Sequence, residues 1–206
     1  MTHLTLAPLA HEDAGPAAEL HISAFPDFFL SRLGSRFLRE FYAGFANDPT
    51  AITVVAHDPE GNIVGIAVGT TEPRGFFKRL LIRQWAGFVI ASIGAAVAHP
   101  AAIPRLLRAV AYRGDVGDRT DGALLSSIFV NSTHRGTGAG GQLLEEWTTA
   151  AARKSADKAF LITDALENDA VNSFYVRHGW VLDGTYQTKE GRAMNRYVKA
   201  MGGGSQ

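Results

Sequence analysis

Arg135-Gly136-Thr137-Gly138-Ala139-Gly140-Gly141 carries the strongest structural signal in this sequence. The stretch follows an apolar, partly β-branched run at residues 124–130 and precedes a run with helical periodicity at 142–154. A glycine-rich turn between a strand and a helix leaves backbone N–H groups without partners, and the helix start adds the positive end of its dipole. The stretch therefore predicts a binding site for a phosphate or a diphosphate.

Composition restricts the class of protein. The chain has 206 residues, of which 46% are hydrophobic and 19% charged, so we expect one folded domain with a sizeable core. The net charge is zero, which argues against nucleic acid as a partner. The absence of cysteine excludes disulfides, thiolate metal ligands and a cysteine nucleophile, and we predict no metal site. The first residues show no basic start and no apolar core of a signal peptide, which favours a cytoplasmic location.

The order of the expected elements predicts a mixed α/β fold. The first half reads as a strand, a helix, a second helix with a strong apolar stripe, and a hairpin, at residues 2–7, 12–21, 31–45 and 52–69. After residue 123 we expect a strand, the glycine loop, a helix, a strand, a helix and a hairpin, which ends near residue 199. This alternation predicts a central twisted sheet flanked by helices, within a single domain over 1–201 and a flexible tail at 202–206.

Residues 73–122 combine a long apolar stretch with flanking basic residues. They are expected to form a helical insertion between the third and fourth strands. Basic residues flank its apolar part, namely Lys78, Arg79, Arg83, Arg105 and Arg108. This pattern permits contact of residues 76–113 with a membrane surface, although the apolar run is too short to span a bilayer. We favour an insertion packed on the domain, whose apolar surface offers a homodimer contact.

Three kinds of phosphate loop compete for the glycine-rich stretch. A P-loop requires Gly-Lys-Ser/Thr, and here Gln142 follows Gly141, which excludes it. A dinucleotide fingerprint matches Gly136-x-Gly138-x-x-Gly141, with Asp164 as the ribose-binding acid. However, residues 131–135 separate the strand from the glycines, and only one helix and a hairpin follow. An NAD(P)-dependent enzyme therefore stays a minor alternative.

The third reading includes the arginine. Arg135-x-x-Gly138-x-Gly140 resembles the Arg/Gln-x-x-Gly-x-Gly/Ala motif of the GNAT superfamily of N-acetyltransferases. Ile128-Phe129-Val130 is similar to the strand that precedes this loop in the family. Asn168 and the run from Asn172 through Phe174-Tyr175 to Gly179-Trp180 are similar to its Asn-…-Phe-Tyr-x-x-x-Gly-Phe segment. Ser132 stands where the family has proline. The resemblance covers residues 124–181 and leaves out the insertion.

The resemblance implies transfer of an acetyl group from acetyl-CoA to an amine, by direct attack in a ternary complex. It implies that two parallel strands splay apart beside the loop and that the pantetheine arm enters between them. The implied cofactor-binding residues are Phe129, Val130, Arg135, Gly136, Thr137, Gly138, Ala139, Gly140, Gly141, Asn168 and Asn172. The glycines are expected to bring the backbone close to the diphosphate, because a Cβ would hold it away. A non-catalytic acyl-CoA sensor would keep the same loop and is the main alternative.

The resemblance assigns the catalytic acid to one residue, whereas the catalytic base has several candidates. Tyr175 matches the tyrosine that protonates the leaving thiolate, and a phenol is neutral at physiological pH. Glu72, at the end of the third strand, is the first choice for the base that deprotonates the amine, with His134, Asp27 or a water as alternatives. Residues 24–29 and the turn at 188–192 are expected to flank the acceptor, a small-molecule amine.

Overall fold

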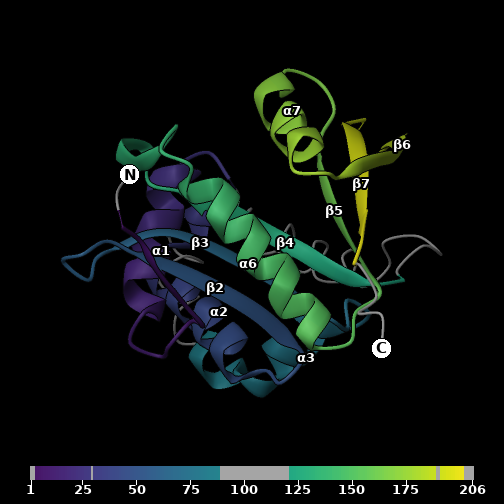
Figure 1. The fold of residues 1–206 in the computed structure, drawn as a ribbon. Helices are drawn as coiled ribbons and strands as arrows, with labels where there is room; N and C mark the ends of the chain where they lie inside the picture. Colours follow the sequence, from purple (N-terminus) through teal and green to yellow (C-terminus); the bar gives the residue numbers. More distant parts are fainter. Residues whose placement is uncertain (1–2, 29, 89–120, 189–190, 202–206) are drawn as a thin grey trace.

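The computed structural model describes residues 3–28, 30–88, 121–188 and 191–201. Its centre is a seven-stranded sheet with the strand order β1-β2-β3-β4-β5-β7-β6 (Figure 1). The strands are β1 Thr5–Ala7, β2 Ala51–His57, β3 Ile63–Thr70, β4 Ala123–Val130, β5 Lys158–Asp164, β6 Val181–Gln187 and β7 Ala193–Ala200. The α-helices are α1 Ala14–Ala24, α2 Ser35–Asn47, α3 Phe76–Arg83, α6 Ala139–Arg153 and α7 Asp169–Arg177, and two short 3-10 helices are η1 Ser31–Leu33 and η2 Ser132–His134.

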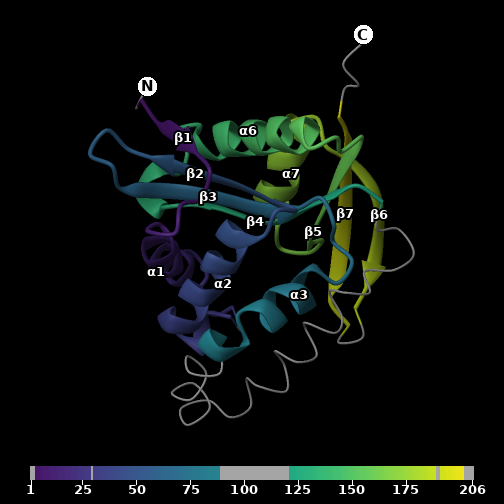
Figure 2. The ribbon, with the colours of Figure 1, turned by 90° about the horizontal axis from the view of Figure 1, so that it is seen from below.

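The sheet divides into two halves. All its neighbouring strands are antiparallel except β4 and β5, which are parallel and pair only at Ala123 with Ala159 and at Leu124 with Phe160. Beyond these two pairs, β4 stays on β3 while β5 stays on β7. Figures 1 and 2 show β5, β7 and β6 set at an angle to the other strands. The splayed parallel strands that the resemblance implied are therefore present.

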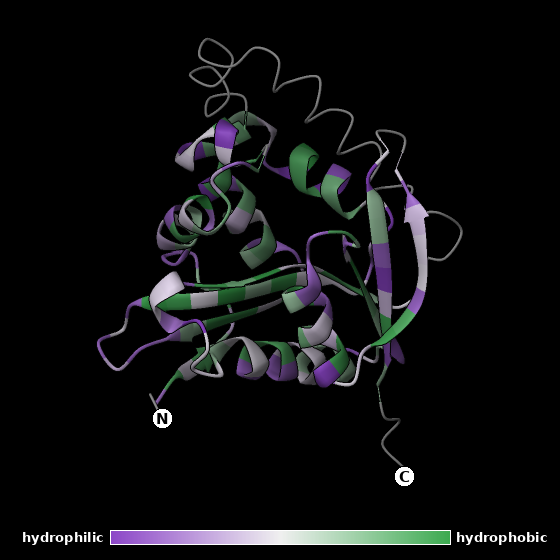
Figure 3. Cartoon of the chain, turned by 90° about the horizontal axis from the view of Figure 1, so that it is seen from above, coloured by the Kyte–Doolittle hydropathy of each residue, from purple (hydrophilic) through white to green (hydrophobic). Residues whose placement is uncertain are grey.

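Helices cover both faces of the first half. In Figure 2, α1, α2 and α3 lie on one face of the sheet and α6 on the other. The face toward α1 and α2 holds an aromatic-rich core, which includes Phe37, Phe41, Tyr42, Phe45 and Phe76. The α6 face holds a second core around Trp147, Tyr175 and Trp180. Figure 3 shows that the central strands carry mostly hydrophobic residues, as strands buried on both faces require.

A β-bulge interrupts β4. Val68 pairs with Ser127 and Gly69 with Leu125, so Ser126 is an extra residue without a partner on β3. Strict alternation would place Leu125 and Ile128 on opposite faces, yet both belong to the α6-side core. The bulge thus changes the phase of the strand, so that Phe129 faces α1 and α2.

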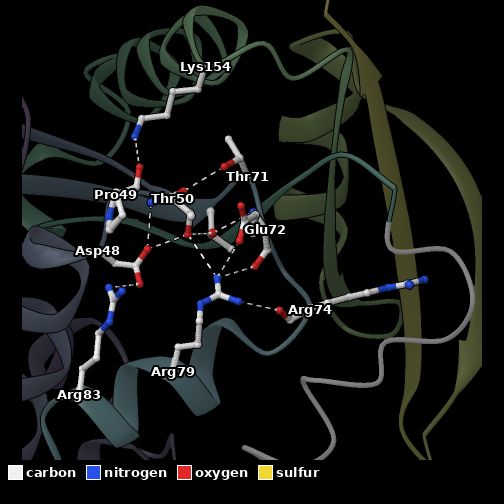
Figure 4. A network of polar contacts seen from close by, with 10 residues as sticks. Asp48, Pro49, Thr50, Thr71, Glu72, Arg74, Arg79, Arg83 and Lys154 are labelled. Atoms are coloured by element: carbon white, nitrogen blue, oxygen red, sulfur yellow. Dashed lines mark hydrogen bonds and ion pairs between the residues drawn. The ribbon is translucent and has the colours of Figure 1, made fainter.

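The first helix of the predicted insertion is fixed to the domain. Phe76, Phe77 and Leu80 of α3 are buried. Arg79 and Arg83 make ion pairs of 3.3 Å with Glu72 and Asp48. Part of the apolar face proposed for membrane contact is therefore buried in the domain, and two of the proposed cations are paired with its carboxylates (Figure 4).

The rest of the insertion, residues 89–120, lies outside the described residues. The membrane-surface and homodimer hypotheses for that part, and the single-domain organisation, therefore stay predictions. Among the described residues, no helix is long and apolar enough to cross a membrane.

Candidate functional site

The glycine-rich loop connects β4 to α6 through a single turn of 3-10 helix. The backbone N–H of Asn131 donates to the carbonyl of Val64 over 2.7 Å, and its side chain accepts from the N–H of Thr133. Gly136 and Gly138 then adopt φ values of 77° and 89°. A Cβ at either position would meet no atom within 4 Å, so the left-handed backbone, rather than lack of space, selects glycine here.

Five backbone N–H groups between Gly136 and Gly141 have no hydrogen-bond acceptor among the described residues. These open amides belong to Gly136, Gly138, Ala139, Gly140 and Gly141. The N–H groups of Arg135 and Thr137 instead bond to Ser132 and His134 carbonyls. The open amides gather at the positive end of a 15-residue helix, an arrangement that suits an anion such as a diphosphate.

Two of the predicted phosphate-loop glycines lie beside the end of α7, and one of them has a packing role there. Gly140 and Gly141 lie inside the first turn of α6, which begins three residues earlier than the sequence indicated. A Cβ on Gly140 would lie 3.6 Å from the ring of Phe174, and one on Gly141 would lie 2.7 Å from Nε2 of His178. Glycine at position 141 therefore leaves room for the His178 ring, whereas a Cβ at position 140 would make an ordinary contact. Binding of the cofactor by both residues stays a prediction.

Tyr175 projects from α7 into the α6-side core, with 6% of its surface exposed. Its ring packs against Trp180 and Tyr197, with centroids 6.1 and 5.9 Å away. Burial raises the pKa of the Tyr175 phenol well above its ordinary value, so the group stays protonated at neutral pH. No hydrogen bond to the Tyr175 hydroxyl is found among the described residues, which leaves this donor available to a ligand.

Asn168 and Asn172 hold α7 in place. Asn168 Nδ2 donates to Thr163 Oγ1 and to the Asp164 carbonyl, at 2.9 and 3.0 Å. Asn172 Nδ2 donates to the carbonyls of Asp164 and Asn168. Its Oδ1 accepts from Asn195 Nδ2 and from the Tyr197 hydroxyl, both at 3.0 Å. All the hydrogen-bonding capacity of the Asn172 amide is therefore used within the protein, and a cofactor contact by either asparagine stays a prediction.

β5 leaves part of β4 uncovered beyond the pair of Leu124 with Phe160, and we call this gap the opening. Glu72 lies apart from the opening. Thr70 pairs with Leu124, at the closed end where β4 and β5 are still joined, and Glu72 follows two residues beyond it. The carboxylate is 63% exposed and pairs with Arg79 in the network of Figure 4. It borders a pocket with Gly122 and Lys158, away from the part of β4 that β5 leaves uncovered.

The first segment expected to flank the acceptor, residues 24–29, contacts β4. Phe25 follows α1, and its ring packs edge-on against Phe129 with centroids 5.4 Å apart. His21 contacts both rings and hydrogen-bonds through Nδ1 to the Tyr42 hydroxyl at 2.7 Å. In the other flanking segment, Arg192 forms a bidentate ion pair with Asp164 at the end of β5. Two residues of that turn, 189–190, lie outside the described residues.

Comparison with known proteins agrees with this architecture. Residues 87–182 match the family model of the acetyltransferase (GNAT) domain. No match is found among curated proteins.

Several solved structures share the fold. One described as an acetyltransferase is 19% identical, with a TM-score of 0.62, and the match covers 96% of this chain and 99% of that one. The ribosomal-protein-S18-alanine N-acetyltransferase from Escherichia coli is 13% identical, with a TM-score of 0.60 and coverage of 99% and 97%. A GNAT-family acetyltransferase from Streptococcus pneumoniae is 19% identical, with a TM-score of 0.58 and coverage of 97% and 100%.

The alternative of a dinucleotide-binding enzyme loses its basis, because such a fold needs an open, mostly parallel sheet. In this sheet only β4 and β5 are parallel, and they separate after two residue pairs. The split sheet, the glycine loop and the match of residues 87–182 to the GNAT domain model support membership of the GNAT superfamily of acetyltransferases, whose fold this chain shares.

Proposed function

We propose that this chain is an N-acetyltransferase that moves the acetyl group of acetyl-CoA to a primary amine of a small molecule. The observation that carries the proposal is the row of open amides at the start of α6, beside the opening between β4 and β5. Acetyl-CoA is the donor that GNAT domains generally use, and its diphosphate matches a helix N-terminus in charge.

The donor is proposed to lie along β4. Its diphosphate binds the amides of Gly136 and of residues 138–141, and the Arg135 guanidinium adds positive charge. Its arm follows the edge of β4 at Phe129 and Val130, where β5 supplies no hydrogen bonds. The amides of the arm then take the place of a missing strand. Thr137 and Ala139 complete the loop around the anion.

The reaction is proposed to be direct. The amine nitrogen attacks the thioester carbonyl carbon, and a C–N bond forms as the C=O electrons move to oxygen. The tetrahedral intermediate collapses, the C–S bond breaks, and the sulfur leaves with its electron pair. The Tyr175 phenol donates a proton to that sulfur, a role open to a hydroxyl that is protonated at neutral pH. Solvent returns a proton to the Tyr175 phenolate, and the ammonium proton of the amine leaves to solvent.

Water is proposed to take that last proton. Glu72, the first choice from the sequence, is paired with Arg79 beyond the closed end of the opening. A base has to approach the proton to within hydrogen-bonding reach, directly or through one water. We therefore expect the amine proton to pass to water without help from Glu72, and substitution of Glu72 serves as a test below.

A screen for thiol release tests the function. The purified protein is mixed with acetyl-CoA and a panel of amino acids, amino sugars, polyamines and aminoglycosides, and free thiol is followed with a chromogenic reagent. At least one amine is expected to raise thiol release above the hydrolysis seen without amine, and mass spectrometry should show the acetylated product. Tight binding of acetyl-CoA with no release for any amine would favour the sensor, and failure to bind coenzyme A at all would remove both readings.

A further inference from the structure

Ser126 occupies the position where β4 loses its partners on both sides. On the β3 side it is the bulge residue, between Leu125 and Ser127, which pair with Gly69 and Val68. On the β5 side, the last pair joins Leu124 to Phe160, two residues earlier. Ser126 therefore lies at the deep, closed end of the opening between β4 and β5.

The Ser126 hydroxyl is also unsatisfied. Its Oγ is buried and, within the part of the chain that the structure describes, has no hydrogen-bond partner. Thr148, another hydroxyl residue with only 7% of its surface exposed, offers a contrast, because its hydroxyl donates to the Glu145 carbonyl over 2.7 Å. A buried hydroxyl without a partner destabilises the fold, and native structures contain few of them. A ligand that supplies a hydrogen-bond acceptor at this point would remove that cost.

The distance from the loop fits a ligand with a long arm. From Val130, where the loop begins, to Ser126 the strand runs four residues, or ~13 Å at about 3.3 Å per residue. A donor held by its diphosphate at the loop and laid along β4 would bring its far end to this residue. Rotation about χ1 of serine between staggered positions can turn Oγ into the opening without movement of the backbone.

We propose that the Ser126 hydroxyl contacts the acyl end of the donor. It donates a hydrogen bond to the thioester carbonyl oxygen, and a stronger one to the oxyanion that forms when the amine attacks. The serine keeps its proton throughout. The C–N bond forms, the C–S bond breaks and Tyr175 protonates the sulfur as in the proposed reaction. The inference rests on the proposed function, because it assigns a contact within the same site.

Infrared spectroscopy of the bound donor tests this contact. Acetyl-CoA labelled with ¹³C at the carbonyl is bound to the unmodified protein and to Ser126→Ala, and the labelled C=O band is isolated by difference. A hydrogen bond from Ser126 is expected to lower the band frequency relative to free acetyl-CoA, and the band should return toward the free value in S126A. Affinity for coenzyme A, which has no acyl carbonyl, should be equal in the two proteins by calorimetry.

Rate and stability should move in opposite directions. Acetyl transfer to the best amine of the panel should fall about 100-fold in S126A, as for loss of one donor to an oxyanion. The melting temperature should stay the same or rise by about 2–4 °C, because an unsatisfied hydroxyl has been removed. Thr148→Val is the matched control, because it removes a buried hydroxyl that has a partner. It should lower the melting temperature and leave the carbonyl band and the rate unchanged.

Each outcome decides the inference. An identical carbonyl band in S126A and the unmodified protein, with both binding acetyl-CoA, overturns the contact while the proposed function stands. If neither binds coenzyme A, the proposed function fails, and the contact fails with it. Should S126A not fold, Ser126→Cys keeps the side-chain size with a weaker donor, and its band should lie between the free and the unmodified values.

Discussion

The two halves of the sheet are covered by helices to different extents. In the half formed by β1 to β4, the central strands are covered by α1 and α2 on one face and by α6 on the other, and β3 is buried almost throughout. In the half formed by β5, β7 and β6, every residue of β6 is exposed, and α7 is the helix that packs against it. The well-packed half carries the glycine loop, and the less covered half supplies Tyr175. The proposed ligand anchor and the proposed acid thus lie in parts that are covered to different extents and are joined at two residue pairs.

The contacts of α7 bridge the two halves. On its own side, Asn172 joins α7 to β5 and β7. On the other side, Phe174 and His178 pack against the first turn of α6, at Gly140 and Gly141. The position of Tyr175 relative to the loop therefore depends on this helix more than on the sheet. Four substitutions test this division of labour.

The largest effect is expected from Gly138→Val, in the well-packed half. A β-branched residue is strongly disfavoured at φ 89°, so the loop must change shape and the row of amides is lost. We expect affinity for coenzyme A to fall by ~100-fold or more, since each lost charge-assisted contact contributes about 1.5–3 kcal/mol. Calorimetry measures the affinity, and circular dichroism should show an intact fold.

Gly184→Val is the control for this loop variant. Gly184 lies in exposed β6, does not have a positive φ, and a Cβ there would meet no atom within 4 Å. Its affinity for coenzyme A should match that of the unmodified chain. Unchanged affinity in G138V itself would show that the diphosphate binds elsewhere.

Tyr175→Phe tests the contribution of the less covered half. Turnover should fall ~100-fold or more, the usual range for loss of a general acid, while coenzyme A affinity stays the same. Because burial raises the Tyr175 pKa, the acid form persists as the pH rises, and the rate of the unmodified protein should show no tyrosine limb near the ordinary pKa of about 10. Tyr197→Phe, which loses a hydrogen bond to Asn172, should affect stability more than turnover. Equal turnover in Y175F and the unmodified chain would rule out the acid role.

Asn172→Ala tests whether this residue positions α7 or binds the cofactor. Loss of four hydrogen bonds should lower the melting temperature by roughly 4–24 °C, at about 0.5–1.5 kcal/mol per bond and about 2–4 °C per kcal/mol. Turnover should fall because Tyr175 loses its support, with coenzyme A affinity little changed. A tenfold loss of affinity at an unchanged melting temperature would instead identify Asn172 as a cofactor ligand, as the sequence predicted.

Glu72→Gln should have the smallest effect. Its ion pair with Arg79 is largely exposed, and such pairs contribute about 0–1 kcal/mol, so the melting temperature should hardly move. Turnover should stay within about twofold, whereas loss of a general base would cost ~100-fold or more. A decrease comparable to that of Y175F would make Glu72 the base after all.

The parts of the fold that depend on local pattern were predictable. The apolar stripe of α2, the β2–β3 hairpin and the order from β4 to β7 follow from periodicity and turn residues. The features that depend on distant partners were not. Nothing in the run from Leu124 to Val130 reveals the bulge, because it arises from register with β3. The packing role of Gly141, which the phosphate-loop pattern does not indicate, likewise depends on His178 of a distant segment.

The same limit explains the candidate site. The loop and Tyr175 could be named from the sequence because their spacing is local. The saturation of Asn172 by Asn195 and Tyr197, and the pairing of Glu72 with Arg79, depend on side chains brought in by other elements. Residue type indicated that both side chains form hydrogen bonds or ion pairs, but it did not indicate which partners they have.

Leu80 of α3 packs against Gly44 of α2 so closely that a Cβ at position 44 would lie 2.6 Å from Leu80 Cγ. Because of this contact, the residue at position 44 and the presence of α3 constrain each other during evolution. A chain that gained α3 had to keep position 44 bare, and one that lost α3 would be released from that constraint. We therefore expect positions 44 and 80 to change in concert when relatives with and without such a helix are aligned.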